Sequence, residues 1–318
     1  MRLLIASSVD GEALEKLQRD HEIVDARGCA PERLAEMGTG CDAIIFRSGV
    51  QITADVMRRS NRLRLLIRAG SGCDNVDLDY VHRQAIEFVR IPEPGARAVA
   101  ELAFALMLSL ARQIPQADAL LRKGRWAKSE LEGFLLRDKV LGIIGCGNIG
   151  ACVGEMGAAW GMEVQGCVDE PSPAVANRLA QRGIRLANFD KVLEEADFLS
   201  IHVPLLESTR NLLDSAALRR MKRGAFLVNL ARGGVVDERA LLEVLQSGHL
   251  RGAGLDVHER EGEGAISGLA SLPQVLLTPH IGASTRDTQK EIGRRIVQII
   301  RARSEEPRLD DAVAAPAK

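Results

Sequence analysis

Short apolar runs alternate with amphipathic segments along the first part of the chain. The runs are rich in Leu, Ile and Val, and the segments between them space their apolar residues as a helix does. The runs lie at 2–7, 22–26, 42–47, 63–70 and 87–91, and the helical segments at 12–18, 31–37, 53–59 and 77–85. Apolar strands separated by helices are typical of a parallel sheet covered on both faces. We therefore expect a doubly wound α/β domain, which ends where Pro92 and Pro94 interrupt the pattern.

A second series of the same kind follows and is longer than the first. Its predicted strands lie at 140–145, 162–169, 198–203, 225–230, 252–256 and 274–278, and its predicted helices at 98–113, 149–160, 173–182, 215–221 and 238–246. A last helical pattern, at about 284–302, has no strand after it. We expect this helix to pack back on the first domain, and we expect ligands at the carboxyl ends of the strands, in a cleft between the two domains.

Charge and composition narrow the classes of function. The 42 Lys and Arg residues nearly cancel the 43 Asp and Glu residues, so no net field favours nucleic acid or an anionic membrane. The apolar stretch 98–111 is short for a bilayer span and contains Glu101, which favours a buried helix or a subunit interface. The chain begins with a strand-like run in place of a signal peptide, so we expect a cytoplasmic protein. The six cysteines form no CxxC pair and no metal-ligand pattern, and we expect neither a metal nor disulfides.

A glycine motif directly follows the predicted strand at 140–145. Gly145, Gly147 and Gly150 form G-x-G-x-x-G at a strand-to-helix junction, where they allow a tight turn, close approach of a pyrophosphate and close helix packing. The next strand ends in Asp169, nineteen residues after Gly150, where a carboxylate accepts hydrogen bonds from the ribose hydroxyls and repels a 2′-phosphate. The pattern predicts NAD as the cofactor, in preference to NADP.

These patterns together predict two doubly wound parallel-sheet domains. A Rossmann dinucleotide-binding domain, residues 95–280, is inserted in a flavodoxin-like substrate domain formed by 1–94 and 281–318.

Three segments at predicted strand ends carry groups suited to the chemistry of a 2-hydroxy acid. They are NLARGG at 229–234, LDVHERE at 255–261 and TPHIGAST at 278–285. Reduction of a 2-keto acid requires a cation for the carboxylate, an acid for the carbonyl oxygen and a partner that keeps this acid protonated. Arg, His and Glu side chains suit these three roles.

The same segments make the chain resemble the D-isomer-specific 2-hydroxyacid dehydrogenase family, and most closely its phosphoglycerate dehydrogenase branch. The resemblance also covers 68–77, 98–117, the dinucleotide motif, HVPLLEST at 202–209 and the whole stretch 229–257. It implies that Arg232, Glu261 and His280 form the catalytic triad. Family spacing selects Glu261 over its neighbours Glu259 and Glu263, and a carboxylate beside the imidazole would favour the charged, acidic form of His280.

The resemblance also assigns residues around the cofactor. Asp256 is expected near the nicotinamide carboxamide, and His202 is expected to contact the cofactor or to pack, without a catalytic role. The full expected set is Gly145, Gly147, Asn148, Ile149, Gly150, Asp169, His202, Pro204, Thr209, Ala231, Asp256 and Gly282. His21, His82, His249 and His258 belong to no motif, and we interpret them as surface or structural residues.

For the substrate, the resemblance points to 3-phospho-D-glycerate, oxidised to 3-phosphohydroxypyruvate in serine biosynthesis. Arg47 and Arg68 match arginines at the distal phosphate, and Lys128 matches a basic residue that reaches across a homodimer. Ser71, Gly72 and Arg232 complete the expected substrate contacts. The chain is similar to short forms without the serine-sensing regulatory domain.

Two positions depart from the family pattern. Gly262 replaces the usual Pro after the catalytic glutamate, which predicts a more mobile loop, and Gly95 stands where Asn is frequent. Glyoxylate or hydroxypyruvate reductase and sulfolactate dehydrogenase stay open as alternative enzymes. An NADH-sensing corepressor of the same fold is the alternative that is not an enzyme, and the complete triad argues against it.

Overall fold

The computed structural model describes residues 1–265 and 267–305, which form two compact units. One unit contains Met1–Gly95 and the segment that begins at Ser284, and the other contains Ala96–Ala283. The boundaries expected from the sequence, at 94/95 and 280/281, lie a few residues away, and residues 306–318 of the expected second segment lie outside the described residues.

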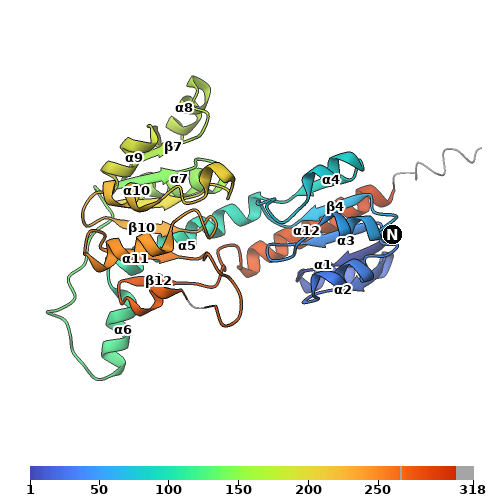
Figure 1. Ribbon diagram of the computed structural model, residues 1–318, viewed down its shortest axis with the longest axis horizontal. Coiled ribbons are helices and arrows are strands. Elements are labelled where there is room, and N and C mark those ends of the chain that lie inside the picture. The colour runs from blue at the N-terminus through green and yellow to red at the C-terminus, as the bar shows by residue number, and fades with distance from the viewer. Residues whose placement is uncertain (266, 306–318) are drawn as a thin grey trace, which may run out of the picture. The chain divides into compact units, whose positions relative to one another are not determined.

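The first unit, as far as it is described, is built on a five-stranded parallel sheet in the order β2-β1-β3-β4-β5 (Figure 1). This is the flavodoxin-like order that the sequence predicts. The strands are β1 (Arg2–Ile5), β2 (Glu22–Asp25), β3 (Ala43–Phe46), β4 (Leu65–Arg68) and β5 (Glu87–Arg90). The helices are α1 (Gly11–Asp20), α2 (Pro31–Met37), α3 (Ala54–Arg59), α4 (Leu78–Arg83) and α12 (Arg286–Ser304).

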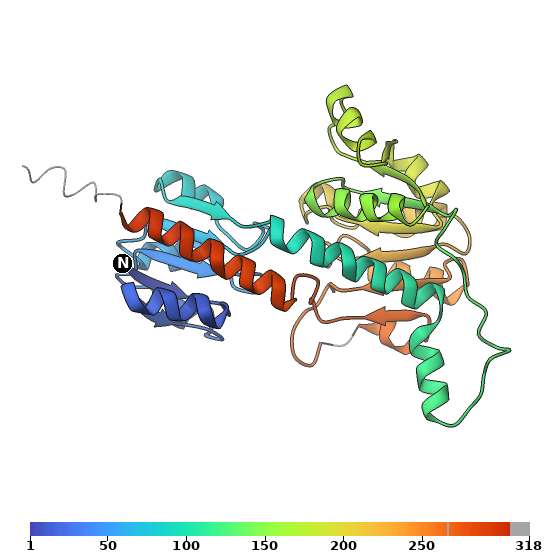
Figure 2. The same cartoon turned by 180° about the vertical axis from the view of Figure 1, so that it is seen from behind.

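Alternate residues of these strands face different helices. Leu3, Ile45 and Ile67 pack with α1 and α12, which lie side by side in Figure 2. Leu4 and Leu66 point to the other face, where α2, α3 and α4 cover them. The expectation that the last helix packs on the first domain is confirmed, because α12 supplies Ile292, Ile296 and Ile300 to this core.

The second unit contains a seven-stranded parallel sheet within the described residues, in the order β12-β11-β10-β9-β6-β7-β8. The strand order reverses beside β6, as in a Rossmann fold. The strands are β6 (Val140–Ile144), β7 (Glu163–Cys167), β8 (Arg185–Leu186), β9 (Phe198–Ile201), β10 (Phe226–Asn229), β11 (Gly252–Leu255) and β12 (Val275–Leu277). The helices are α5 (Glu93–Ala111), α6 (Ile114–Arg122), α7 (Asn148–Ala159), α8 (Pro173–Ala180), α9 (Phe189–Glu195), α10 (Ser215–Arg220) and α11 (Glu238–Gln246), with 3-10 turns at Glu207–Thr209 and Gly268–Ser271.

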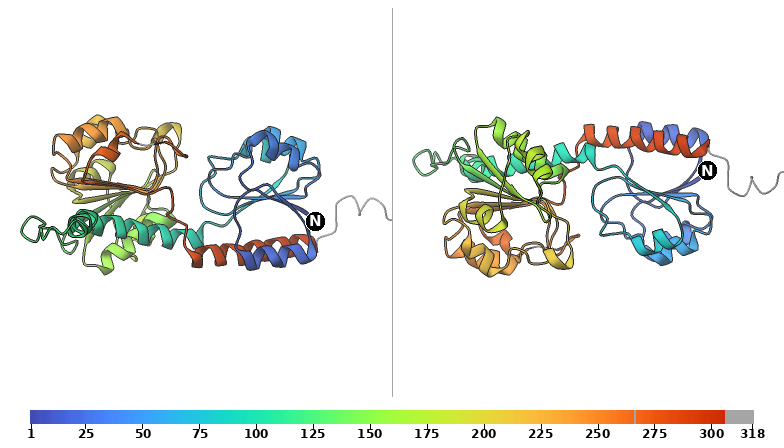
Figure 3. Two further views of the ribbon diagram at one scale, coloured as in Figure 1. Left: turned by 90° about the horizontal axis from the view of Figure 1, so that it is seen from below. Right: turned by 90° about the horizontal axis from the view of Figure 1, so that it is seen from above.

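Helices cover both faces of this second sheet, as Figure 3 shows. One face, which includes Leu199, Leu227 and Leu255, packs against α9, α10 and α11. The other face, which includes Ile143 and Val228, packs against α5, α7 and α8. The two-domain parallel architecture expected from the sequence is therefore confirmed.

Helix α5 corrects two details of the sequence analysis. It begins at Glu93, five residues before the predicted start at 98, because Pro94 lies in its first turn, where the missing N–H has no intrahelical role. It is the one helix among the described residues that is long and apolar enough to cross a membrane, and 56% of its most apolar window is buried inside the protein. Ala103, Phe104 and Met107 belong to the core of the second unit. Burial in this core explains the apolar composition of residues 98–111, for which a subunit interface was the alternative.

Three elements were not predicted. Strand β8 has two residues and helix α9 has seven, too short for a periodic pattern to stand out. Helix α6 follows Gln113, whose φ of 52° ends the preceding helix. Figure 2 shows α6 and the loop that follows it standing away from the body of its unit, and the chain returns to the core at Leu136.

Candidate functional site

The glycine loop after β6 has the geometry that a bound dinucleotide requires. Gly145 has φ +91°, and a side chain there would lie 2.7 Å from the carbonyl oxygen of His202. A Cβ on Gly150 would overlap the carbonyl oxygen of Gly145, so the helix approaches the loop as closely as glycine allows. Apart from its two chain neighbours, no described residue has an atom within 4 Å of a Cβ placed on Gly147, so the loop is open to a ligand at that point.

Helix α7 begins directly after this loop, and its N-terminus is suited to a phosphate. Gly147 is the N-cap and provides no side-chain hydrogen bond, so the N–H groups of the first turn, which includes Asn148 and Ile149, have no side-chain cap. β6 pairs with β7 through Ile144 and Cys167, so the exposed Asp169 follows β7 at the same edge of the sheet. A helix N-terminus suited to a phosphate and an exposed carboxylate therefore follow two adjacent strands.

The segment after β9 lies next to the glycine loop and has a rigid start. His202 Nε2 is 2.7 Å from Ser200 Oγ, and burial lowers the pKa of His202 to about 3, so the imidazole is neutral. Its Nδ1 is buried and has no hydrogen-bond partner among the described residues. Thr209 Oγ1 donates to the carbonyl oxygen of Pro204 at 2.6 Å and accepts from the Leu206 N–H at 2.7 Å. The segment is therefore held in shape by its own hydrogen bonds.

Arg232 is held in a tight turn after β10. The buried Asn229 supports this turn, because its Oδ1 accepts from the Ala231 N–H at 3.0 Å and its Nδ2 donates to the Arg232 carbonyl oxygen at 3.1 Å. The guanidinium donates to the Ala231 carbonyl oxygen at 2.7 Å. Asn229 belongs to the NLARGG segment but was not among the predicted site residues, and a polar residue that ends a buried strand is the signal that marks it.

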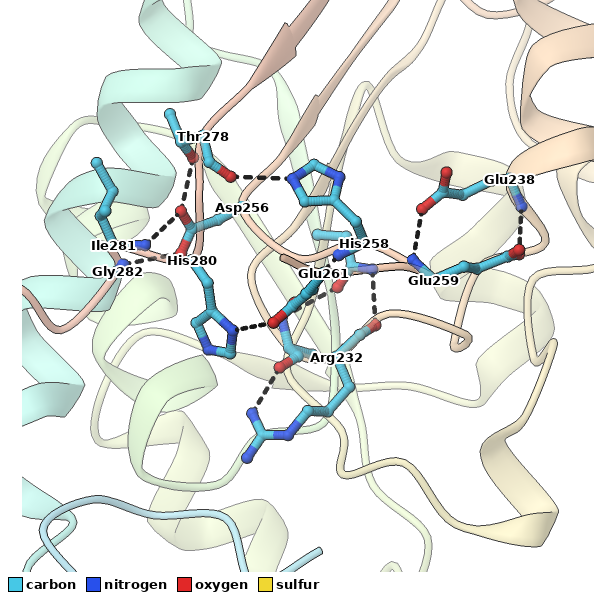
Figure 4. A network of polar contacts seen from close by, with 12 residues as sticks. Arg232, Glu238, Asp256, His258, Glu259, Glu261, Thr278, His280, Ile281 and Gly282 are labelled. Atoms are coloured by element: carbon cyan, nitrogen blue, oxygen red, sulfur yellow. Dashed lines mark hydrogen bonds and ion pairs between the residues drawn. The ribbon is translucent and has the colours of Figure 1, made fainter. Parts of the chain in front are cut away.

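His280 and Glu261 form a hydrogen-bonded pair. The Nδ1 of His280 is 2.9 Å from Glu261 Oε2, so the ionised carboxylate accepts from Nδ1–H (Figure 4). Burial acts to raise the pKa of Glu261, but the hydrogen bond and charge of His280 outweigh it, and the net pKa lies below its ordinary value. The carboxylate is therefore ionised, and it orients the imidazole by holding one ring nitrogen.

The choice among three neighbouring glutamates is made by hydrogen bonds. Glu259 Oε1 accepts from the Glu238 N–H at 3.1 Å, while Glu238 Oε1 accepts from the Glu259 N–H at 2.8 Å. Glu259 is thus committed to the start of α11, and Glu261 is the glutamate that reaches His280. A cavity of about 550 Å³ opens beside this pair, lined among others by His258, Arg260 and Thr278.

Asp256 organises the loop that carries His280. It is 1% exposed, and its carboxylate accepts from Thr278 Oγ1 at 2.6 Å, from the Ile281 N–H at 2.9 Å and from the Gly282 N–H at 2.8 Å. Its carbonyl oxygen accepts from the His280 N–H at 2.8 Å. His280 has φ 53°, a left-handed conformation that is rare for a residue with a side chain, and these bonds sustain it. The expected contact of Asp256 with nicotinamide stays a prediction beside this structural role.

Arginines gather at the carboxyl ends of the strands of the first unit. Arg68 ends β4, is 3% exposed and is the register partner of Arg90 on β5, whose guanidinium reaches the Ser71 carbonyl oxygen at 3.5 Å. Arg47 follows β3 and is half-buried; burial lowers its pKa. No acidic side chain of the described residues pairs with Arg47 or Arg90. Arg90 was not among the predicted substrate contacts, and the strand register brings it beside Arg68.

The remaining predicted substrate contacts are loop or surface residues. Ser71 and Gly72 lie in the loop after β4, in the first unit. Lys128 lies in the second unit, exposed, in the segment after α6.

Comparisons with known proteins agree with this geometry. Residues 104–282 match the family model described as "D-isomer specific 2-hydroxyacid dehydrogenase, NAD binding domain". The chain is 36% identical to D-3-phosphoglycerate dehydrogenase of Methanocaldococcus jannaschii over 95% of its own length and 57% of that protein, so it spans little more than half of this relative. It is 37% identical to hydroxypyruvate reductase of Thermotoga maritima over 94% of its own length and 97% of that protein.

A solved structure shares the fold of the chain. The D-lactate dehydrogenase of Aquifex aeolicus, determined with NAD and lactic acid, is 28% identical, covers 96% of each chain and has a TM-score of 0.82.

Proposed function

The chain belongs to the D-isomer-specific 2-hydroxyacid dehydrogenase family, and from this premise we propose that it oxidises a small D-2-hydroxy acid with NAD and catalyses the reverse reduction. The observation that carries the proposal is the Glu261–His280 pair. It lies in the same unit as Arg232 and the glycine loop, so this unit contains an acid–base group, a cation and a cofactor cradle.

The residues that would hold NAD are those of the open loop and its neighbours. Gly145, Gly147 and Gly150 with the start of α7 would take the pyrophosphate, and Asp169 the adenosine ribose. The chemistry that bound NAD supplies is acceptance of a hydride from C2 of the substrate, or its return. The absence of a cationic side chain directly after Asp169, where Glu170 follows, favours NAD over NADP.

His280 moves the proton in this proposal. With Nδ1–H donated to Glu261, the other nitrogen, Nε2, takes the proton from the C2 hydroxyl during oxidation and returns it to the carbonyl oxygen during reduction. The ionised Glu261 stabilises the imidazolium that forms, as the carboxylate does in related acid–base pairs. The C2 hydroxyl thus loses its proton to His280 as C2 loses its hydride, which leaves the 2-keto acid.

Arg232 orients the substrate. A guanidinium presents two parallel N–H donors to a carboxylate, a geometry that lysine does not reproduce. Figure 4 shows the guanidinium of Arg232 and the imidazole of His280 in the same part of the network. Arg232 would therefore hold the C1 carboxylate while His280 acts at the neighbouring C2 oxygen.

For the substrate tail we propose a second anion, with 3-phospho-D-glycerate as the first candidate. The half-buried Arg47, which pairs with no acidic side chain of the described residues, places positive charge at a strand end of the first unit, and burial of a cation is costly unless an anion compensates it. The test is a comparison of kcat/KM with NAD for 3-phospho-D-glycerate, D-glycerate, D-lactate and sulfolactate. We expect the phosphorylated acid to be preferred; equal use of D-glycerate or D-lactate would contradict the proposal.

Hydroxypyruvate reduction is the second candidate, and one observation favours it. The hydroxypyruvate reductase of T. maritima is 37% identical to the chain, and the phosphoglycerate dehydrogenase of M. jannaschii is 36% identical. A chain that reduces hydroxypyruvate with NADH faster than it reduces 3-phosphohydroxypyruvate would support this candidate.

We also propose that the chain forms a homodimer through the segment 114–135. This segment exposes Ile114, Leu121, Trp126 and Leu135, with Trp126 79% exposed, and a surface with so many apolar side chains is typical of a subunit contact. Light scattering should give twice the mass of 34.5 kDa, and Trp126→Glu should lower it; a wild-type monomer at micromolar concentration contradicts the proposal.

A further inference from the structure

His258 contacts all three segments that carry the proposed catalytic side chains. Its backbone N–H donates to Glu261 Oε1 at 3.3 Å, and its ring Nε2 is 3.0 Å from the carbonyl oxygen of Thr278, two residues before His280. Its carbonyl oxygen packs on Gly233, where any Cβ would overlap it. His258, which follows β11, therefore joins the loops of Arg232, Glu261 and His280.

The direction of the ring hydrogen bond is fixed by its acceptor. A carbonyl oxygen accepts and does not donate, so Nε2 of His258 carries the proton. The other ring nitrogen, Nδ1, is buried and has no partner among the residues that the structure describes. Within the described part of the chain, the ring therefore makes one hydrogen bond, to the loop that carries His280.

We propose that His258 is a positioning residue that sets the approach of Glu261 to His280. This inference rests on the proposed function, because it assigns His258 a part in keeping that acid–base pair productive. Glu261 is followed by Gly262 and Gly264, which have φ of 133° and 78°. Glycines restrict the backbone little, so the position of the carboxylate depends on contacts made before them. His258 makes one contact with Glu261, through its backbone N–H, and one with the loop that carries His280, through its ring.

A separate anchor holds the far part of the same loop. Glu238 Oε2 accepts from Ser267 Oγ at 2.6 Å, in addition to the reciprocal bonds between Glu238 and Glu259. These contacts do not involve the His258 ring. Removal of the ring should therefore leave the loop attached to α11 and disturb mainly the spacing between Glu261 and His280.

The experiment compares His258→Phe, which removes the ring donor, with His258→Gln, whose Nε2 can replace it. The exposed His82 provides a matched control, His82→Phe. In reduction of 3-phosphohydroxypyruvate and of hydroxypyruvate with NADH, His258→Phe should lower kcat roughly 10–100-fold, the scale of a small misplacement of reacting groups. KM and NADH affinity should stay at the wild-type values, and His258→Gln should recover most of kcat. An unchanged kcat in His258→Phe overturns the inference, as does an equal loss in both variants.

A second readout does not depend on turnover. Proton NMR should show a downfield Nδ1–H resonance of His280, hydrogen-bonded to Glu261, in the wild type, in His258→Gln and in His82→Phe. The resonance should be lost or broadened in His258→Phe while the melting temperature stays close to that of the wild type. An inactive wild type would refute the proposed function, and the NMR comparison would still decide the inference. A resonance that persists in His258→Phe overturns it.

Discussion

The two units of the chain differ in how their charged side chains are partnered. In the second unit, the carboxylates of Asp256 and Glu261 receive hydrogen bonds from the protein itself, and His280 is held in an unusual backbone conformation. In the first unit, Arg47 and Arg90 lie at strand ends without an acidic partner among the described residues. The contrast agrees with the proposed function, in which the acid–base pair is preorganised and an anionic substrate would complete the charge of the first unit.

The largest expected effect comes from the second unit. His280→Ala should lower kcat by about 10²–10⁴-fold with every substrate that the enzyme accepts, because the proton-transfer group is lost. Arg232→Ala should lower kcat by about 10²–10³-fold, as expected when a preorganised charge is removed. Steady-state kinetics with NADH titration measures both, with His82→Ala as the control. A collapse of NADH affinity in His280→Ala would make His280 structural.

A smaller and more selective effect is expected in the first unit. Arg47→Ala should raise KM for 3-phospho-D-glycerate by about tenfold or more, the scale of a lost charged hydrogen bond, and should change turnover of D-glycerate little. The exposed Arg83 offers a control in the same unit, Arg83→Ala. An equal effect on both substrates would remove the distinction between the two units.

A substitution of Asp169 tests the preference for NAD over NADP. Asp169→Ala should reduce the preference for NAD over NADP by about tenfold, roughly 1.4 kcal/mol, because the carboxylate no longer repels the 2′-phosphate. The neighbouring Glu170→Ala is the matched control, since it removes the same charge one residue away. Equal kcat/KM of the unmutated enzyme with both cofactors would refute the assignment.

The smallest effect on activity is expected at His202. The folded protein holds the pKa of His202 at about 3 against an ordinary value of 6.5, because the ring is buried. Between these values the unfolded chain binds more protons, so this residue makes stability fall as pH decreases from about 6.5 to 3, by up to about 1.4 kcal/mol per pH unit.

His202→Asn should remove this part of the slope and leave the shape of the pH profile of kcat unchanged. Denaturant titrations at several pH values check the slope, with His82→Asn as the control. A slope identical to that of the wild type would show that His202 is not held neutral.

The sequence predicted the parts of the site that depend on local patterns. The three glycines, Asp169 and the strand-end segments of Arg232 and His280 follow from spacing along the chain and from resemblance to a family. Parallel sheets with buried faces produce continuous apolar runs, and for this reason both domains could also be predicted.

The supporting residues could not be predicted because their roles depend on contacts between distant segments. Glu238 meets Glu259 across 21 positions, and His258 meets Thr278 across 20. The sequence favoured a mobile loop at Gly262, but nothing in it indicated the anchor that Glu238 provides. Arg90 becomes a neighbour of Arg68 only through the register of β4 and β5.

The most direct test of the account is the fate of the hydrogen at C2. With 3-phospho-D-glycerate deuterated at C2 and NAD, the enzyme should transfer the deuterium to the nicotinamide ring, and mass spectrometry should find one deuterium in each NADH formed. His280→Ala should slow this transfer without changing the isotope content of the product. No formation of NADH would exclude 3-phospho-D-glycerate as the substrate, and D-glycerate deuterated at C2 would then be used. Formation of NADH without deuterium would contradict the central claim that a hydride passes between C2 and NAD.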